Sequence, residues 1–360
     1  MKQSSIFYSL LCISIFLFGC HKENERNDRS VYTLSNQTGG NQVMVFDRGS
    51  NGALSFKTSF STGGSGTGAT LGSQGALALS SNKQWMFAVN AGSNDISVLQ
   101  VTEDGLALKD KKPSGGTNPI SISNYNNLVY VLNAGADPNI SGFYLGNDGT
   151  LTPIANSTTP LKDKAPGPAQ ISFANNGSVL VITEKTGNKI VSYNLSASGT
   201  PGDLHEITAA SSTPFGFAVG NNGNIFVTEA GQGALSVYNV GQSSISLVDG
   251  PVVTNQKAAC WAVITENGNF VYVANAASNS ISGYRVSSLN HVTLLNASGV
   301  TAVTGSSPID EALSERSRFL YVLNSVSHNI SSFSVEDDGS LSPIGTAGTL
   351  PTGTVGLAAR

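Results

Sequence analysis

The sequence predicts an all-β fold, a seven-bladed β-propeller of four-stranded antiparallel blades. Its main signal is a run rich in Val, Ile, Leu and Tyr that closes on Asn or Glu. The distance between closing residues ranges from 43 (Asn90 to Asn133) to 54 (Asn36 to Asn90), in or near the roughly 40–50 residues of propeller repeats. The seven runs are Val31–Asn36, Met86–Asn90, Val129–Asn133, Leu180–Glu184, Ile225–Glu229, Val271–Asn275 and Leu320–Asn324.

Other strand signals keep a constant order around this run. A short run of small residues precedes it and suits an innermost strand, because blades crowd together at the central axis. The quoted run is the second strand, and its continuous apolar residues indicate burial between neighbouring blades. A third strand begins six or seven residues after the closing Asn or Glu, and several repeats then turn at Asp-Gly into an outer strand. The predicted inner strands start at Ala76, Pro119, Ala169, Phe215, Trp261 and Ile309.

The two ends of the chain are incomplete in complementary ways. The first repeat, from Val31 to about Phe60, lacks an inner strand, whereas Val355–Ala359 has no second strand after it. We therefore expect the C-terminal strand to complete the first blade and close the ring. The expected domain is a single propeller over residues 30–360.

Composition narrows the class of partner. Charged residues make up 12% of the chain and the formal net charge is −4. No repeat carries a basic stripe, so nucleic acid is excluded as a partner. A monomer is expected, because a propeller hides its strand edges within the ring.

The N-terminus carries the pattern of an export signal. Lys2 supplies a positive end, and residues 6–18 form an apolar run that is shorter than the 20 or so residues of a membrane span. The segment Leu17-Phe18-Gly19-Cys20 is similar to the lipobox of bacterial lipoproteins. This similarity implies a signal peptide over residues 1–19 and a lipid on Cys20. An ordinary secretory signal is the alternative.

Residues 20–29 carry charges of both signs and no hydrophobic side chain, which predicts a flexible tether. The implied location is the bacterial envelope. A lipid would hold the protein to the outer membrane, on its periplasmic side or at the cell surface, and would be its only membrane attachment.

The closing residues should lie on one face of the ring, around the mouth of the central channel. Where they are Asn, we expect them to hydrogen-bond the local turn. Glu184 and Glu229 replace Asn in consecutive repeats, and neighbouring carboxylates could bind a cation or act as a general base with a raised pKa. Lys185 would support such a base electrostatically. An ion pair with Lys185, or simple solvation, is the alternative.

Other polar and aromatic residues are expected at the same rim. An amide beside aromatic rings suits the binding of a sugar or another small molecule, although Trp261 could instead plug the channel. Asp310 and Glu311 begin the last inner strand, and only one of them can face the channel because side chains alternate along a strand. The predicted ligand-binding residues are Gln170, Phe215, Trp261, Asp310 and Asn133.

Neither a metal nor a cofactor is expected. The four His residues are not spaced as a metal pair. Gly63–Gly68 has the composition of a phosphate loop, but it lacks the Lys and no helix-forming stretch follows. We expect it to be a connector over the mouth of the second blade, where it could act as a lid.

The Tyr-Val-Leu-Asn repeats, with their Asp-Gly-Thr-Leu and Asp-Gly-Ser-Leu turns, resemble the seven-bladed lactonase family. This family includes 6-phosphogluconolactonase and the fungal 3-carboxymuconate cycloisomerase. The resemblance implies catalytic residues in the fourth repeat, where family members carry Gly-Pro-Arg-His at the start and Asn-Glu at the end. Here Ala169 stands at the Arg, Gln170 at the His, Glu184 at the Asn and Lys185 at the Glu.

Gln170 cannot replace a His in proton transfer, because an amide does not titrate near neutral pH. Only a one-residue shift would bring Glu184 to the catalytic place. The acid–base pair that the resemblance implies is otherwise absent.

Two hypotheses follow. The first is a non-catalytic or weakly catalytic propeller of the bacterial envelope, which binds a sugar-like or lactone-like molecule or an envelope partner at the channel mouth. The second is a lactone hydrolase or muconate-type cycloisomerase with Glu184 or Glu229 as its base.

Overall fold

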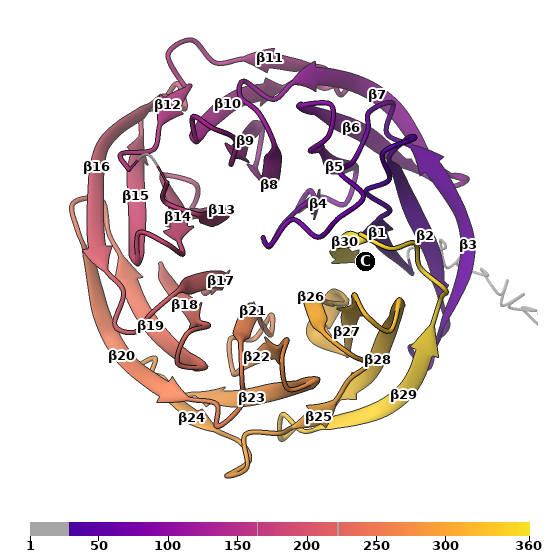
Figure 1. Cartoon of the computed structure of the whole chain (residues 1–360), viewed down its shortest axis with the longest axis vertical. Coiled ribbons are helices and arrows are strands. Elements are labelled where there is room, and N and C mark those ends of the chain that lie inside the picture. The colour runs from indigo at the N-terminus through magenta and orange to yellow at the C-terminus, as the bar shows by residue number, and fades with distance from the viewer. Residues whose placement is uncertain (1–28, 164, 222) are drawn as a thin grey trace, which may run out of the picture.

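Seven antiparallel sheets surround a central axis in the computed structural model, which describes residues 29–163, 165–221 and 223–360 (Figure 1). The predicted signal peptide, Cys20 and the tether up to residue 28 lie outside these residues. Each sheet is one blade, and its strands are stacked from the axis to the rim. The predicted all-β, seven-bladed propeller is confirmed.

The blades are numbered in chain order. Blade 1 contains β1 (Ser30–Leu34), β2 (Gln42–Arg48), β3 (Leu54–Ser61) and the C-terminal β30 (Val355–Ala359). Blade 2 contains β4 (Leu77–Leu79), β5 (Trp85–Asn90), β6 (Asp95–Thr102) and β7 (Gly105–Pro113). Blade 3 contains β8 (Pro119–Tyr125), β9 (Leu128–Asn133), β10 (Asn139–Leu145), β11 (Leu151–Pro153) and the short β12 (Thr159–Pro160). Blade 4 contains β13 (Pro168–Ala174), β14 (Val179–Glu184), β15 (Lys189–Leu195) and β16 (Pro201–Thr208).

The remaining three blades follow the same plan. Blade 5 contains β17 (Pro214–Val219), β18 (Asn224–Glu229), β19 (Ala234–Val240) and β20 (Ile245–Val253). Blade 6 contains β21 (Ala259–Ile264), β22 (Phe270–Asn275), β23 (Ser280–Val286), β24 (Val292–Leu294) and β25 (Ala302–Val303). Blade 7 contains β26 (Pro308–Leu313), β27 (Phe319–Asn324), β28 (Asn329–Val335) and β29 (Leu341–Ala347), with a 3₁₀ turn at Glu315–Ser317. Within the described residues, no helix has the length and apolar character needed to cross a membrane.

The second strands form the buried core of the ring. In β5, β14, β18, β22 and β27 every residue is buried. This burial explains their continuous apolar sequences, because each strand packs against a neighbouring blade on both of its faces.

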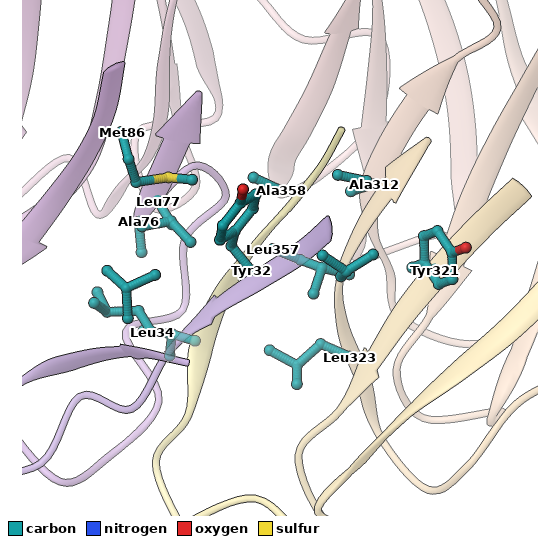
Figure 2. Close-up of a cluster of buried hydrophobic side chains, with 14 of the residues drawn as sticks. Tyr32, Leu34, Ala76, Leu77, Met86, Ala312, Tyr321, Leu323, Leu357 and Ala358 are labelled. Carbon is teal, nitrogen blue, oxygen red and sulfur yellow. The ribbon is translucent and has the colours of Figure 1, made fainter. Parts of the chain in front are cut away.

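The C-terminal strand closes the ring, as the sequence predicts. β30 pairs antiparallel with β1, with Val31 opposite Ala359, and the hydroxyl of Thr33 donates to the carbonyl of Gly356 at 2.7 Å. Figure 2 shows Leu357 and Ala358 of β30 between side chains of blade 7 on one side and blade 2 on the other. Closure therefore joins the first and last described strands in one hydrophobic cluster.

Candidate functional site

The mouth of the channel is formed where first strands begin and second strands end. In blade 4, for example, Pro168 at the start of β13 lies opposite Glu184 at the end of β14. Lys185 follows β14 directly, and Phe215 lies near the start of β17 in the next blade. Antiparallel pairing thus brings residues that are distant in sequence to one face of the ring.

A non-strand segment from the connector between β3 and β4 enters the channel at this mouth. We call residues 71–75 the axial segment, and the trace that leads into β4 reaches toward the centre of the ring (Figure 1). The hydroxyl of Ser73 donates to the carbonyl of Ile120 in blade 3 at 2.8 Å. The backbone amide of Gln74 donates to the carbonyl of Ala169 in blade 4 at 3.1 Å.

The side chain of Gln74 crosses the axis to blade 6. Its Nε2 donates to the carbonyl of Ala262 at 2.9 Å, and its Oε1 accepts from the Ala262 amide at 3.2 Å. Blade 5 makes room for it with a glycine, since a Cβ on Gly216 would lie 2.1 Å from Gln74 Oε1. The axial segment is therefore hydrogen-bonded to blades 3, 4 and 6 and links them across the channel.

Lys185, Phe215 and Trp261 lie together above the axial segment, and we call them the mouth cluster. The Lys185 ammonium lies 4.6 Å from the centre of the Phe215 ring and donates to the carbonyl of Gly72. The rings of Phe215 and Trp261 are 5.1 Å apart, and the Trp261 indole Nε1 donates to the carbonyl of Ser73 at 3.1 Å. Trp261 is buried, whereas Lys185 and Phe215 are partly exposed.

The mouth cluster carries one positive charge, the Lys185 ammonium, which is largely removed from water. Burial lowers the pKa of Lys185, because the ammonium loses water that favours its charge. Burial also raises the pKa of the nearby Cys260 thiol to about 12, so this thiol stays protonated at neutral pH. A cation held against an aromatic face in this way is suited to attract an anionic or carbonyl oxygen.

Gln170 lies in the wall between blades 4 and 5. Its Nε2 donates to the carbonyl of Phe217 at 3.0 Å, and its Oε1 accepts from the Phe217 amide at 2.6 Å. Gln170 and Gln74 therefore play the same part, in which an amide side chain completes backbone hydrogen bonds between blades. Both ends of the Gln170 amide are used in this contact.

In blades 2, 3, 6 and 7 the closing Asn bonds to the third strand of its own blade. In blade 1, Asn36 Nδ2 instead donates to the carbonyls of Ala69 and Gly353. Asn133 Nδ2 donates to Asn139 Oδ1 at 2.9 Å and to the Ser114 carbonyl at 3.2 Å. Asn90 likewise donates to Asp95 and Ser97. These buried amides hold the second strand to the third strand and to the loop outside it.

Glu229 follows the same rule in blade 5. Its Oε2 accepts from the Ser236 hydroxyl at 2.8 Å, and its Oε1 accepts from the Tyr238 hydroxyl at 2.7 Å. Both oxygens are satisfied inside the blade, and Glu229 is fully buried. Its carboxylate has no contact with the mouth cluster.

Glu184 also points away from Lys185, toward the rim of blade 4. Its carboxylate makes no hydrogen bond to another described residue, and a Cβ on Gly187 would lie 3.1 Å from Glu184 Oε2 and 3.4 Å from Asp163 Oδ2. Lys189 stands beside it, 3.2 Å from Asp163 and 3.4 Å from Glu206. Burial and the charge of Asp163 raise the pKa of Glu184 to about 7.

Asp310 and Glu311 are both buried within blade 7 and face its two neighbours. Asp310 lies near the backbone amide of Leu357 in β30, and Glu311 lies near that of Ala274 in β22. Asp310 Oδ2 and both oxygens of Glu311 have no hydrogen-bond partner. Burial raises the pKa of Asp310 to about 8 and that of Glu311 well above its ordinary value, so burial favours the neutral form of both acids.

The structure thus unites three of the predicted residues, Lys185, Phe215 and Trp261, and places the others elsewhere in the blades. Sequence analysis missed Ser73 and Gln74. Their signal is an unusually long connector between blades. β3 ends at Ser61 and β4 begins only at Leu77, whereas β7 ends at Pro113 and β8 begins soon after, at Pro119. Among the residues that the structure describes, no group of three or more His, Cys, Asp and Glu side chains could hold a metal ion.

Comparisons with known proteins bear on the fold and on part of the sequence. Residues 242–355 match the family model described as "Lactonase, 7-bladed beta-propeller". No curated protein sequence matches the chain.

Several solved structures share the fold. The periplasmic gluconolactonase PpgL of Pseudomonas aeruginosa is 15% identical with a TM-score of 0.70, over 91% of this chain and 99% of that one. A Bacteroides fragilis protein provisionally called a 6-phosphogluconolactonase is 15% identical with a TM-score of 0.69, over 93% and 99%. A Lactobacillus plantarum protein is 17% identical with a TM-score of 0.73, over 92% and 99%.

At these identities the solved structures support the fold alone, whereas the family model supports the sequence relationship in the C-terminal part. The resemblance to the seven-bladed β-propeller lactonase family is thereby confirmed, in sequence over residues 242–355 and in fold over nearly the whole chain.

Proposed function

We propose that this lactonase-like propeller binds a small sugar-like or lactone-like molecule at the channel mouth without turning it over at an appreciable rate. The observation that carries the proposal is the mouth cluster. Lys185 is partly exposed there and holds an ammonium against Phe215. A carboxylate or lactone carbonyl can accept from this ammonium while its carbon skeleton packs on the aromatic ring.

The directions of the two glutamates support binding rather than catalysis. A general base must come within hydrogen-bond reach of the proton it removes. The Glu229 oxygens are occupied by Ser236 and Tyr238. Glu184 points to the rim of its blade, and Gln170 offers no titrating group where the family pattern has a His.

A second candidate function is lactone hydrolysis or cycloisomerisation with Glu184 as the base. The pKa of about 7 favours it, because a general base works best when its pKa lies near the working pH. It would require the carboxylate to turn from the Asp163 side of its loop toward the mouth. We rank it below binding for that reason.

One set of titrations separates the two functions. The full-length protein is tested by calorimetry against glucono-1,5-lactone, gluconate and a muconolactone, and turnover is followed by proton release. We expect binding without turnover, and we expect Lys185→Met to weaken that binding about ten-fold. Lys257→Met, an exposed lysine on the same face, is the matched control. Turnover that Glu184→Gln abolishes would establish the enzyme instead, and a failure of all three probes to bind would reject the mouth site.

We also propose that the protein is a monomer anchored in the outer membrane of a bacterial envelope by a lipid on Cys20. The support is the lipobox-like segment and the short apolar run before it. Cys20→Ser should abolish incorporation of labelled palmitate and release the protein from the membrane fraction. Retention of the label would refute the anchor, and light scattering of the purified protein tests the monomer.

A further inference from the structure

Four pockets lie on the face of the ring opposite the mouth, which we call the turn face because it carries the turns between first and second strands. Together they extend over blades 2 to 6. The pocket between blades 2 and 3 has a volume of about 490 Å³, and the one between blades 4 and 5 has about 390 Å³. Both volumes fall within the roughly 300–1,000 Å³ of small-molecule sites.

The lining of these pockets is uncharged. No Asp, Glu, Lys or Arg is among the described residues that line the four pockets. Two acids on this face are engaged locally, since Asp148 accepts from Thr150 and Glu266 accepts from the Arg316 amide. Lys83 stands between Asn82 and Gln84 but does not line the pocket, and its charge interacts with Glu315, Arg360 and Glu266. An anionic ligand such as a phosphate therefore finds no counter-charge among the lining residues.

Asparagine amides supply most of the polar groups. Some of them are used within the turns, as when Asn82 Oδ1 accepts from the Gln84 amide at 3.1 Å. Asn127, Asn147 and Asn176 are different, because they are exposed and their side chains make no hydrogen bond to another described residue. Each offers two donors and an acceptor to a ligand.

Aromatic rings lie among these amides. Trp85 lines the pocket between blades 2 and 3. Tyr125 lines two further pockets, and its ring lies 6.1 Å from that of Phe173. Tyr125 is partly exposed, so the pockets offer a flat apolar surface beside free amides.

We propose that the turn face binds a neutral oligosaccharide, or a segment of a neutral polysaccharide, across the grooves of blades 2 to 4. Sugar hydroxyls are both donors and acceptors and match amide groups, while the C–H face of a pyranose ring packs on an aromatic ring. A linear sugar chain presents such groups along its whole length, so one chain can contact grooves on more than one blade. This site is separate from the mouth cluster and does not depend on the function proposed there.

The test uses the full-length protein and a panel of neutral linear hexasaccharides, namely maltohexaose, cellohexaose, laminarihexaose and xylohexaose, with hexagalacturonate as the anionic comparison. We expect at least one neutral hexasaccharide to bind in calorimetry and hexagalacturonate to bind more weakly or not at all. The double variant Asn127→Ala/Asn147→Ala should weaken binding roughly ten-fold, because it removes two hydrogen-bonding side chains. Tyr125→Ala should weaken it by a similar factor.

Controls locate the site and check the fold. Gln232→Ala is an exposed amide deletion on the mouth face, and Lys185→Met changes the mouth cluster, so neither should alter hexasaccharide binding. The melting temperature of the double variant should match that of the parent protein, because both of its sites are exposed. The proposal is overturned if no neutral hexasaccharide binds, if hexagalacturonate binds best, or if the folded groove variants bind as well as the parent.

Discussion

Blades 4 and 5 carry the same residue at the same place and use it differently. Glu184 and Glu229 both end a second strand, and both are followed nine positions later by a tyrosine. In blade 5 the position seven residues on is Ser236, whose hydroxyl reaches the carboxylate. In blade 4 that position is Val191, and neither it nor Tyr193 makes a hydrogen bond to Glu184.

The carboxylate of Glu229 is thus satisfied by hydroxyls of its own blade, whereas that of Glu184 is not. Without partners, Glu184 lies buried beside Asp163, and its pKa rises to about 7. Burial of Tyr193, followed by the charges of Glu184 and Glu206, raises the pKa of its phenol to about 12. The chemistry of a glutamate at the closing position therefore depends on whether the third strand of its blade offers it a hydroxyl.

The largest effect should come from opening the ring that holds both blades. Deletion of Val355–Arg360 removes β30, exposes the apolar faces of blades 2 and 7, and unties blade 1. We expect loss of cooperative thermal unfolding, measured by circular dichroism. A truncated protein with an unchanged melting temperature would refute closure by this strand.

The next effect compares the two acids directly. Glu229→Ala leaves the hydroxyls of Ser236 and Tyr238 buried without their acceptor, which should cost about 3 kcal/mol in the free energy of unfolding. Glu184→Ala breaks no hydrogen bond to a described residue and should cost about 1 kcal/mol. Urea unfolding at pH 7 measures both variants, and equal losses would show that the two blades do not differ as described.

The pH dependence of stability isolates Glu184. Its pKa is about 7 when folded, against an ordinary 4.5, so the folded protein binds the proton more tightly than the unfolded chain. Stability from this group is therefore full below about pH 4.5 and falls as pH rises toward 7, by at most about 3 kcal/mol and by less where water reaches the carboxylate.

Glu184→Gln should remove this slope and make the protein more stable than its parent at pH 8. Asp310 and Glu311, whose pKa values are also raised, add slopes of the same sign. The difference between parent and variant cancels them, and Glu229→Gln serves as the matched control in blade 5. Parallel stability curves for parent and Glu184→Gln would contradict the assignment.

The smallest effect exchanges the residue that distinguishes the blades. Val191→Ser places a hydroxyl where blade 5 has one. A bond to Glu184 should reduce the stability that the protein loses between pH 5 and pH 8 by about 1 kcal/mol. The reciprocal Ser236→Val should introduce a loss of stability above neutral pH in blade 5. Urea unfolding at pH 5 and pH 8 checks both variants. If neither substitution changes the pH dependence of stability, the charges near Asp163 rather than the hydroxyl cause the difference between the blades.

The repeat pattern alone predicts the sheets, their order and the closing strand. A second strand that is buried on both faces needs a continuous run of apolar residues, and a tight turn needs residues such as Gly, Asn or Asp. Both features can be recognised in a short stretch of sequence. The gathering of Lys185, Phe215 and Trp261 was predictable as well, since they stand at the ends of predicted strands on one face.

Contacts across the ring were decided only by the tertiary structure. Trp261 bonds to Ser73 across 188 residues of sequence, and Lys185 bonds to Gly72 across 113. The direction of Glu184, the inter-blade role of Gln170 and the burial of Asp310 likewise depend on which side chain a neighbouring strand presents. A repeat fixes the backbone of each blade through local rules, whereas the partner of a polar side chain is set by packing between segments that the sequence keeps apart.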